Sequence, residues 1–593
     1  MSGIGMVLDI ATSALIAQQQ SIDVTAHNIA NVNTDGYSRQ SPDLEAKMPV
    51  VSNGLIMGRG VNVQQVIQSS DQFIENRLMQ ENSNLSSSTE MEKYLQVVEG
   101  YFNETSDTGM STMLNDFWNN WYDISNNPSG SAERSTLYEK STLLAEQFNE
   151  LGNNLTQVKT DLTNSVSSGV ESINKITNEI AQLNNQIVGM ENDNTANDLR
   201  DKRTALVSEL NQYLDVKTFE QSNGSLTIIS AKGCTLVQGN SSYDLEMGAG
   251  DRVIWQNSSG GTVDITDYIS NGKLGGWLDL RDDVIAKYQL NLDALANQFI
   301  WAVNQQHSQG VGLEGFSTVT SSNAVSNTGA GLGIGGTGGS GLDYYDKITD
   351  GAFNLWVYDS TGAVVSGSGS ANPINVTAGT TTLSDLCDEI NTTATNISAP
   401  ITASITTDGK LKIDAASGYT FAFSDDNSNV LAALGINTFF TGSNASNMGV
   451  NDIIGVNQNN IAAGQVGSDG TIAAGSNANA LAVTDLQNTS MNISQWTCDR
   501  VNGNTQGSTI STINNYYNSL VGSIGIDSAS ASRDKSFAET MVNEISNMRD
   551  SISGVSLDEE LTNLIKYQHA YGAAAKLIST SDEMLTTLLN TKQ

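Results

Sequence analysis

Apolar residues recur every seven positions at both ends of the chain. In a helix predicted over residues 4–30, the series is Leu8, Leu15, Ile22 and Ile29. Near the C-terminus, the series is Leu557, Leu564, Tyr571, Ile578 and Leu585. This spacing is typical of a coiled coil, in which each helix buries its apolar stripe against a partner. We therefore expect the terminal segments, residues 1–37 and 556–593, to form two helices that pair with each other.

Long helices are predicted between the two ends, because apolar residues recur there at steps of three and four. The predicted helices cover residues 71–102, 131–190, 197–214, 277–307, 508–524 and 534–552. Ser556 and Glu559 have the spacing of a capping box, which predicts that the last helix starts at Ser556. We expect a long-helix domain assembled from residues 38–215, 271–317 and 508–555.

Strands are predicted where apolar and polar residues alternate. A β-hairpin is expected near residues 38–67, with Asn53-Gly54 as its turn. Short strands over 216–270 predict a small β-rich subdomain. Residues 318–507 are interpreted as a β-rich outer insertion, which can be divided further, with a Gly/Ser-rich linker at 318–342 and a hairpin turn at Asp408-Gly409. The predicted fold class is multidomain α+β: paired terminal coiled-coil helices, a long-helix bundle and β-rich domains inserted in the middle.

The charge of the chain limits its partners. The formal net charge is −36, so nucleic acid and anionic membranes are disfavoured as partners. No run of about 18 apolar residues occurs, so no segment is expected to span a membrane. The first basic residue is Arg39, and Asp9 interrupts the first apolar run. This pattern does not match a secretory signal peptide, so we expect any export to use another route.

The reactive residues form no pattern of a catalytic or metal site. His27, His307 and His569 lie far apart, and Cys234, Cys387 and Cys498 form no paired motif. The stretch "GLGIGG" at 331–336 lacks the preceding strand and following helix of a dinucleotide site. We therefore predict no enzyme activity, no catalytic residues, no cofactor and no resident metal. Acidic clusters at 191–198 and 424–427 leave a weak Ca²⁺ contact open, although they lack EF-hand spacing.

The first helix carries little charge on any face. Residues 10–22, "IATSALIAQQQSI", include no charged residue. A helix exposed to water normally has a charged face. This favours self-assembly, in which neighbouring subunits cover the terminal helices.

Two terminal motifs resemble a known family. The stretch "AHNIANVNTDGYSRQ" is similar to the Asn-rich motif of the axial proteins of the bacterial flagellum, namely rod, hook and hook-associated proteins. The residues that match this motif as its turn are Asn28, Asn31, Gly36 and Tyr37, and His27 stands where the family usually has Asn. The C-terminal "LDEE", "YQHAY" and "AAAKLI", with "NDLRDKRTALVSEL" and "NGKLGGWLDLRD", resemble more narrowly the hook-associated proteins of the hook–filament junction.

The resemblance implies a structural role. Proteins of this kind form a ring of about eleven subunits, join the hook protein below to a second hook–filament junction protein above, and are required for filament assembly. The resemblance also implies an extracellular location, export by the flagellar type III pathway without a cleaved signal peptide, and an export chaperone at the C-terminal helix. Two alternatives stay open: another axial protein of hook or filament type, and a flagellum-displayed hydrolase in the middle insertion.

Overall fold

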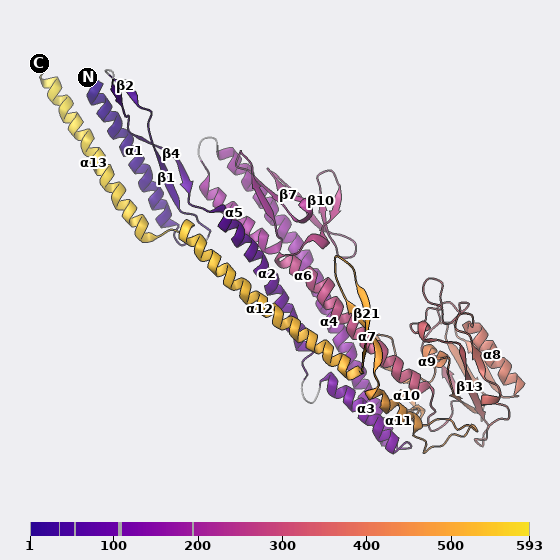
Figure 1. The fold of residues 1–593 in the computed structure, drawn as a ribbon. Coiled ribbons are helices and arrows are strands. Elements are labelled where there is room, and N and C mark those ends of the chain that lie inside the picture. Colours follow the sequence, from indigo (N-terminus) through magenta and orange to yellow (C-terminus); the bar gives the residue numbers. More distant parts are fainter. Residues whose placement is uncertain (1, 35, 53–54, 105–108, 192–194, 592–593) are drawn as a thin grey trace. The chain divides into compact units, whose positions relative to one another are not determined.

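The computed structural model describes residues 2–34, 36–52, 55–104, 109–191 and 195–591. These residues divide into two compact units (Figure 1). Unit 1 comprises residues 1–94, 161–280 and 529–593, and unit 2 comprises 95–160 and 281–528. Three long helices contribute residues to both units: α2 (Gln72–Tyr101), α4 (Ser131–Met190) and α12 (Ile513–Ser553). The predicted α+β class is confirmed, whereas the finer domain boundaries remain predictions.

Unit 1 combines helices with small antiparallel sheets. Its further helices are α1 (Ser2–Ala30), α5 (Asn197–Tyr213), α6 (Gly272–Asp279) and α13 (Leu557–Asn590). The predicted hairpin is present as β1 (Gln40–Ala46) paired with β4 (Val61–Gln68) and β2 (Val50–Ser52) paired with β3 (Leu55–Met57). The predicted turn residues Asn53 and Gly54 lie outside the described residues.

The short strands predicted over 216–270 form two sheets of unit 1. One has the order β5-β6-β7-β8 and the other the order β11-β10-β9. Their bounds are β5 (Lys217–Glu220), β6 (Leu226–Ile229), β7 (Thr235–Gln238), β8 (Ser241–Ser242), β9 (Leu245–Met247), β10 (Val253–Gln256) and β11 (Thr262–Asp264).

Trp277 of α6 joins three helices of unit 1. Its ring lies against Gly169 of α4, where an added Cβ would come within 2.7 Å of the indole. A glycine is therefore needed at position 169 for the two helices to approach this closely. The indole nitrogen donates a hydrogen bond to Glu90 of α2, 2.9 Å away. This contact holds α2, α4 and α6 in one packed group.

Unit 2 contains the remaining elements. Its helices are α3 (Met110–Asn126), α7 (Ile285–Ser308), α8 (Leu383–Asn396), α9 (Val430–Leu434), α10 (Asp452–Val456) and α11 (Ala478–Asp485). Its strands are β12 (Thr318–Thr320), β13 (Gly351–Tyr358), β14 (Ile374–Val376), β15 (Ile401–Ile405), β16 (Leu411–Ala415), β17 (Thr420–Ser424), β18 (Phe440–Thr441), β19 (Gly449–Val450), β20 (Met491–Thr497) and β21 (Thr505–Ser511). The predicted hairpin around Asp408-Gly409 is confirmed as β15 paired with β16.

The core of unit 2 is rich in aromatic side chains. Phe117 of α3 lies 5.2 Å from Phe299 of α7, measured between ring centroids, and Phe148 of α4 stacks on the same Phe299 at 6.2 Å. Phe439 and Phe440 complete the cluster. These rings are fully buried and bring α3, α4 and α7 together around β18.

Three sequence predictions about these elements are wrong. The stretch 318–342 is not a linker: it begins with strand β12 and continues as an ordered loop, in which Leu332 is buried and its amide donates to the carbonyl of Thr381, 2.9 Å away. The helices predicted at 508–524 and 534–552 are one helix, α12, because the stretch between them contains no Pro and the single Gly525 does not end the helix; residues 508–511 belong to β21. The helix predicted over 277–307 is interrupted by a π-helical turn, Leu280–Val284.

His307 is buried in unit 2 with both ring nitrogens engaged. Nδ1 donates to the carbonyl of Asn437, 2.8 Å away, and Nε2 accepts the amide of Ala462, 2.9 Å away. The imidazole is therefore neutral and held in one tautomer. Burial lowers the pKa of His307 from 6.5 to about 4, with the nearby Arg134 cation acting in the same direction. His307 is thus a packed histidine whose two ring nitrogens are both satisfied.

We predict that His307 does not titrate until the pH falls to about 4, whereas the unfolded chain takes up this proton near pH 6.5. Above pH 6.5, neutral His307 therefore contributes about 3 kcal/mol to the free energy of unfolding. This contribution is lost as the pH falls from 6.5 to 4. The chain has three histidines, so ¹⁵N-histidine NMR can follow each, with His307→Gln to assign the signal. A His307 midpoint above pH 6 would contradict this account.

Candidate assembly interface

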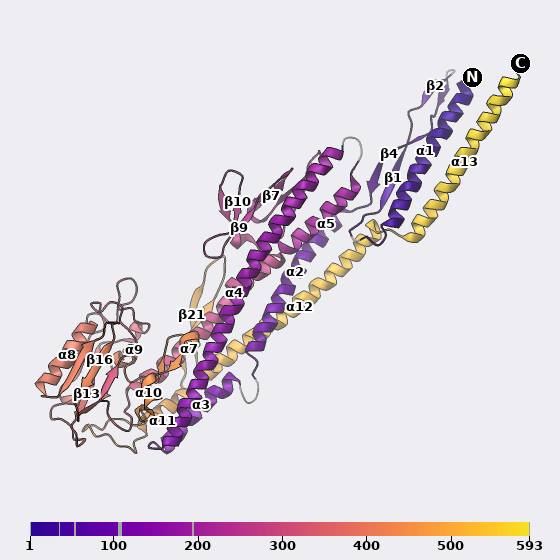
Figure 2. The same ribbon diagram turned by 180° about the vertical axis from the view of Figure 1, so that it is seen from behind.

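The terminal helices α1 and α13 lie side by side and antiparallel in unit 1 (Figure 1), and Figure 2 shows the same pairing from behind. The predicted pairing of the two chain ends is thus confirmed. The most buried side chains of the pair are small or polar. On α1 they are Ala11, Ser13, Ala17, Ser21, Thr25 and Asn28; on α13 they are Glu560, Ala574 and Ser581. Small side chains allow two helix backbones to approach closely.

The buried positions of α13 follow a heptad that differs from the predicted series. Glu560, Ala574 and Ser581 are spaced at multiples of seven. In the predicted series, Leu557 and Tyr571 are exposed, at 46% and 39%, whereas Leu564, Ile578 and Leu585 are half-buried. On α1, the predicted Leu8, Leu15, Ile22 and Ile29 are half-buried. The two series differ by three positions, which is about 60° of the helix circumference, so the contact lies to one side of the predicted apolar stripe.

Large apolar side chains remain exposed on both helices of the pair. The residues are Val7 and Ile16 on α1, and Leu561, Ile565, Leu577, Met584, Leu588 and Leu589 on α13. Contiguous exposed apolar surface on a folded protein marks an interaction site. None of the helices in the described part of the chain is long and apolar enough to cross a membrane. The exposed faces of the α1–α13 pair are therefore the candidate assembly interface.

The chain turns sharply after α1, in the Asn-rich motif. The amide of Asn31 donates to the carbonyl of His27, 3.1 Å away, and the Asn31 side-chain amide donates to the same carbonyl at 3.0 Å. Gly36 has φ of +75°, a backbone conformation that glycine adopts without a steric penalty. Asn31 thus satisfies a terminal carbonyl of α1.

Asn28 holds the start of β1 against the end of α1. Its side-chain carbonyl accepts the amide of Gln40 at 3.0 Å, and its side-chain NH₂ donates to the carbonyl of Gln40 at 2.8 Å. The same NH₂ donates to the carboxylate of Glu560 on α13, 3.1 Å away. Because Asn28 is 1% exposed, these groups are shielded from water and depend on one another.

Arg39 makes a second link to the start of α13. Its guanidinium lies 2.7 Å from the carboxylate of Glu559 and 3.5 Å from that of Glu560, and its amide donates to the carbonyl of Ser553. The predicted capping box is wrong: Ser556 is the N-cap residue, but within the described residues its side chain makes no capping hydrogen bond. The ion pair with Arg39 accounts for the position of the Glu559 carboxylate instead.

Tyr37 holds this turn against the end of α1. Its hydroxyl donates to Asn28, 2.8 Å away, and therefore accepts a hydrogen bond from Nδ1 of His27 at 3.1 Å. Burial raises the pKa of the Tyr37 hydroxyl, and the carboxylates of Asp198 and Asp201 raise it further. The hydroxyl is therefore protonated at neutral pH and available as a donor.

The first turn of α5 supplies acceptors to the same turn and to the hairpin. Asp201 accepts the amide of Ser38 at 3.3 Å and the side-chain amide of Gln68 at 2.9 Å, and Asp198 accepts the side-chain amide of Gln40 at 3.0 Å. Burial raises the pKa of Asp201, although these donors oppose the shift.

Of the four predicted turn residues, Asn28 and Tyr37 are hydrogen-bonded to each other, and Asn28 links them to Glu560 of α13. Asn31 satisfies the end of α1 and Gly36 supplies the turn conformation. Sequence spacing did not reveal these partners.

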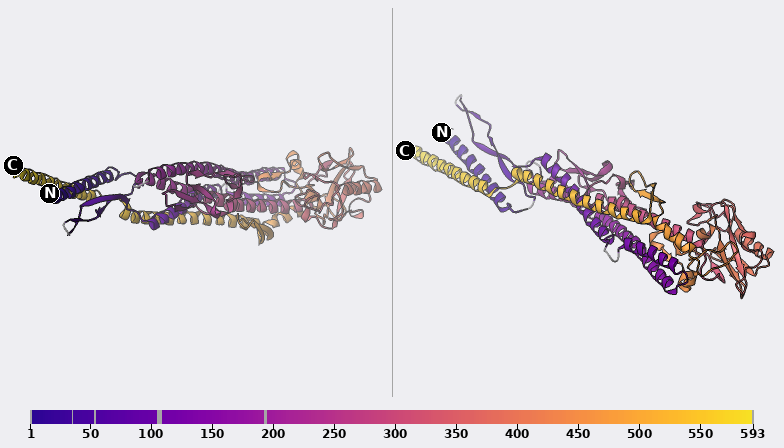
Figure 3. Two further views of the ribbon diagram at one scale, coloured as in Figure 1. Left: turned by 90° about the horizontal axis from the view of Figure 1, so that it is seen from above. Right: turned by 60° about the horizontal axis from the view of Figure 1, so that its bottom comes forward.

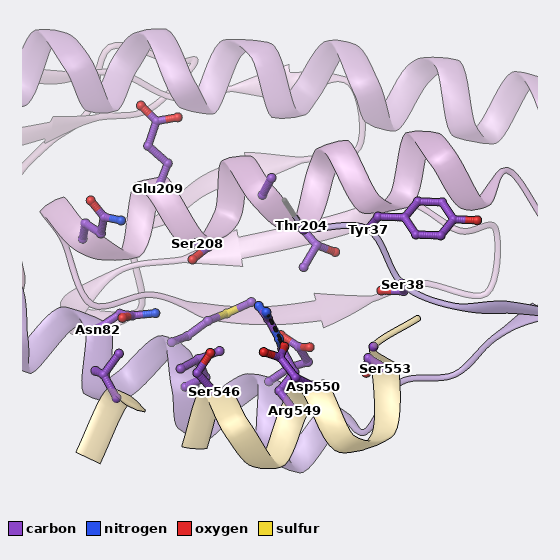
Figure 4. Close-up of a pocket in the computed structure, with 18 residues that line it drawn as sticks. Tyr37, Ser38, Asn82, Thr204, Ser208, Glu209, Ser546, Arg549, Asp550 and Ser553 are labelled. Carbon is purple, nitrogen blue, oxygen red and sulfur yellow. Dashed lines mark hydrogen bonds and ion pairs between the residues drawn. The ribbon is translucent and has the colours of Figure 1, made fainter. Parts of the chain in front are cut away.

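A polar cavity of about 390 Å³ lies beside this turn, between α2, α5 and α12 of unit 1 (Figure 4). Ser208 of α5 and Ser546 of α12 line it from opposite sides, and Arg549 is paired with Asp550 at 2.7 Å. Burial raises the pKa of Glu75 at its edge. Among the described residues, no group of His, Cys, Asp or Glu side chains is placed to hold a metal ion.

We predict that Asn28→Ala loosens the end of α1, because it leaves the buried amide and carbonyl of Gln40 unpaired. Each such group costs about 1–3 kcal/mol, so amide exchange at Gln40 should be at least about tenfold faster. Hydrogen exchange with mass spectrometry on the purified chain measures this. Asn33→Ala, at an exposed position of the same motif, is the control. Equal exchange rates in both variants would contradict the role of Asn28.

Three family models match the chain. The model of the flagellar hook-associated protein FlgK helical domain matches residues 95–320. The model of the flagella basal body rod protein matches residues 8–37, and that of the flagellar basal body rod FlgEFG protein C-terminal region matches residues 549–591. The two rod-protein models thus coincide with α1 and its turn, and with α13.

Whole proteins are similar along the full length of the chain. The chain is 27% identical to flagellar hook-associated protein 1 of Bacillus subtilis strain 168, covering 100% of this chain and 99% of that one. It is also 27% identical to flagellar hook-associated protein 1 of Escherichia coli K12, covering 98% of both chains.

A solved structure shares the fold. The flagellar hook junction protein FlgK from Burkholderia pseudomallei aligns with a TM-score of 0.52 at 18% identity, over 81% of this chain and all of that one. The helical-domain model, the two terminal models and the full-length relatives agree with the paired terminal helices. This chain belongs to the flagellar hook-associated protein 1 family.

Proposed function

We propose that the protein is a structural adaptor at the junction between the flagellar hook and the filament, where it is required for filament assembly. The observation that carries this proposal is the exposed apolar face of the α1–α13 pair. The contact between α1 and α13 contributes little hydrophobic stabilisation, because its most buried side chains include alanine and serine. Each large apolar side chain that a neighbouring subunit covers contributes about 1.5–3 kcal/mol, so assembly completes the burial that the isolated pair lacks.

The turn network gives this pair a defined geometry. Asn28 and Arg39 connect the end of α1 to the start of α13, through Glu560 and Glu559. The position of α13 on α1 is therefore set within one subunit, and a neighbouring subunit meets exposed apolar side chains whose positions are already fixed. This preorganisation lowers the entropic cost of assembly.

The proposed partners follow from the family and from the exposed face. The subunits form a ring of about eleven copies, between the hook protein and a second hook–filament junction protein. Before export, a chaperone covers the apolar face of α13, which would otherwise promote aggregation. The proposed location is the extracellular flagellum, reached by the flagellar type III pathway without a cleaved signal peptide. Full-length similarity to hook-associated protein 1 supports this role over that of a hook or filament protein.

We predict that deletion of the gene leaves hooks intact but removes filaments, with unpolymerised filament protein released into the medium. The reason is that filament subunits have no acceptor surface without the adaptor. Electron microscopy of the cells and immunoblotting of the medium measure both effects, and a plasmid-borne copy is the control. Normal filaments in the deletion strain would refute the proposed function.

A further inference from the structure

The tip of the β-hairpin in unit 1 is an exposed apolar surface outside the α1–α13 pair. We define the hairpin tip as Met48, Val50, Val51, Ile56 and Met57. Met48 is 87% exposed and Ile56 is 77% exposed. Lys47 and Arg59 are exposed on either side, and no acidic residue lies between them in the sequence. A two-stranded ribbon with uncovered apolar side chains is marginally stable alone, which indicates that another surface covers it.

A second apolar surface lies on the unit 1 part of α12. We define the α12 stripe as Phe537, Met541, Met548 and Ile552. At 100° per residue these four side chains fall within about 60° of the helix circumference. Phe537 is 67% exposed, Met548 is 47% exposed and Ile552 is 41% exposed. Asp534 and Glu544 lie on the same face and are exposed together with Arg533, so this face carries an excess of negative charge where the hairpin tip is basic.

The hairpin tip and the α12 stripe of one copy cannot meet. Strand β1 starts beside the end of α12, where the amide of Arg39 donates to the carbonyl of Ser553. The hairpin then runs back along α1, so that an added Cβ on Gly60 would come within 3.3 Å of the backbone of Ile10. Ile10 and Asn28 are separated by about 27 Å along α1. In Figures 1 and 3, α12 extends from the end of α1 in the direction opposite to that of the hairpin.

We propose that the hairpin tip of one copy docks on the α12 stripe of a neighbouring copy. Lys47 and Arg59 then lie against Asp534 and Glu544, and the apolar side chains of both surfaces are buried together. This inference rests on the proposed assembly into a ring, and it names the lateral contact. Because the two surfaces differ, the contact is heterologous, and such contacts close into rings when the rotation between copies allows it.

The test is disulfide cross-linking between copies in assembled flagella. A chain carrying Ile56→Cys and Met548→Cys should give dimers, trimers and higher species after mild oxidation, because each copy contributes one partner to each neighbour. Each single variant should remain monomeric, which also controls for the native cysteines. Ile56→Cys combined with Tyr122→Cys, at a position that is 54% exposed on α3 of unit 2, is the matched control and should give no ladder.

Several results would overturn this contact. Dimers from Met548→Cys alone would show a symmetric contact between two copies of α12. The absence of a ladder in flagella that carry filaments would exclude the contact while leaving the junction function intact. If the cysteine variants do not assemble, charge exchange decides: Lys47→Glu and Glu544→Lys should each reduce the incorporated protein several-fold, and together they should restore it. Failure of the double exchange to restore incorporation would contradict the proposal.

Discussion

The architecture of unit 1 depends on one buried amide. The side chain of Asn28 satisfies both backbone groups of Gln40 and reaches the carboxylate of Glu560, which is more than 500 positions away in the sequence. This side chain fixes where α1 ends, where the hairpin starts and where α13 begins. A buried amide finds no other hydrogen-bond partners when its own are removed, so a displacement of one of the three elements destabilises the other two. The direction in which the chain leaves the helix pair follows from that coupling.

The α1–α13 pair balances two requirements. Under the proposed function, a subunit must keep its apolar side chains from associating before assembly and must bury them in the assembly. Alanine and serine at the inner contact keep the helices close without a large hydrophobic contribution, while Leu561, Leu577 and Met584 remain outside. Most of the apolar area of the pair is therefore left for contacts between subunits. Membership in the flagellar hook-associated protein 1 family agrees with this division.

Sequence periodicity predicted the long helices and the hairpins, because local spacing determines them. The 60-residue helix α4 and the hairpin around Asp408-Gly409 are examples. Helix α3 was missed, although Leu114, Phe117, Trp118 and Trp121 have helical spacing that could have revealed it. The predicted heptad on α13 lies three positions from the buried one, because the contact uses small and polar side chains, which an apolar pattern does not identify. The partners of Asn28 and Arg39 could not be predicted, since no local pattern links residues so far apart.

The central claim is that the outer face of the α1–α13 pair is buried in assembly and contributes little to the folding of one subunit. The most direct measurement is the amount of a Leu577→Asp variant incorporated into purified flagella, compared with Val456→Asp. Leu577 is 50% exposed on α13, and Val456 is 89% exposed in unit 2. The account predicts that Leu577→Asp is secreted and folded but absent from flagella, whereas Val456→Asp is incorporated normally. Equal incorporation of both variants would contradict the account.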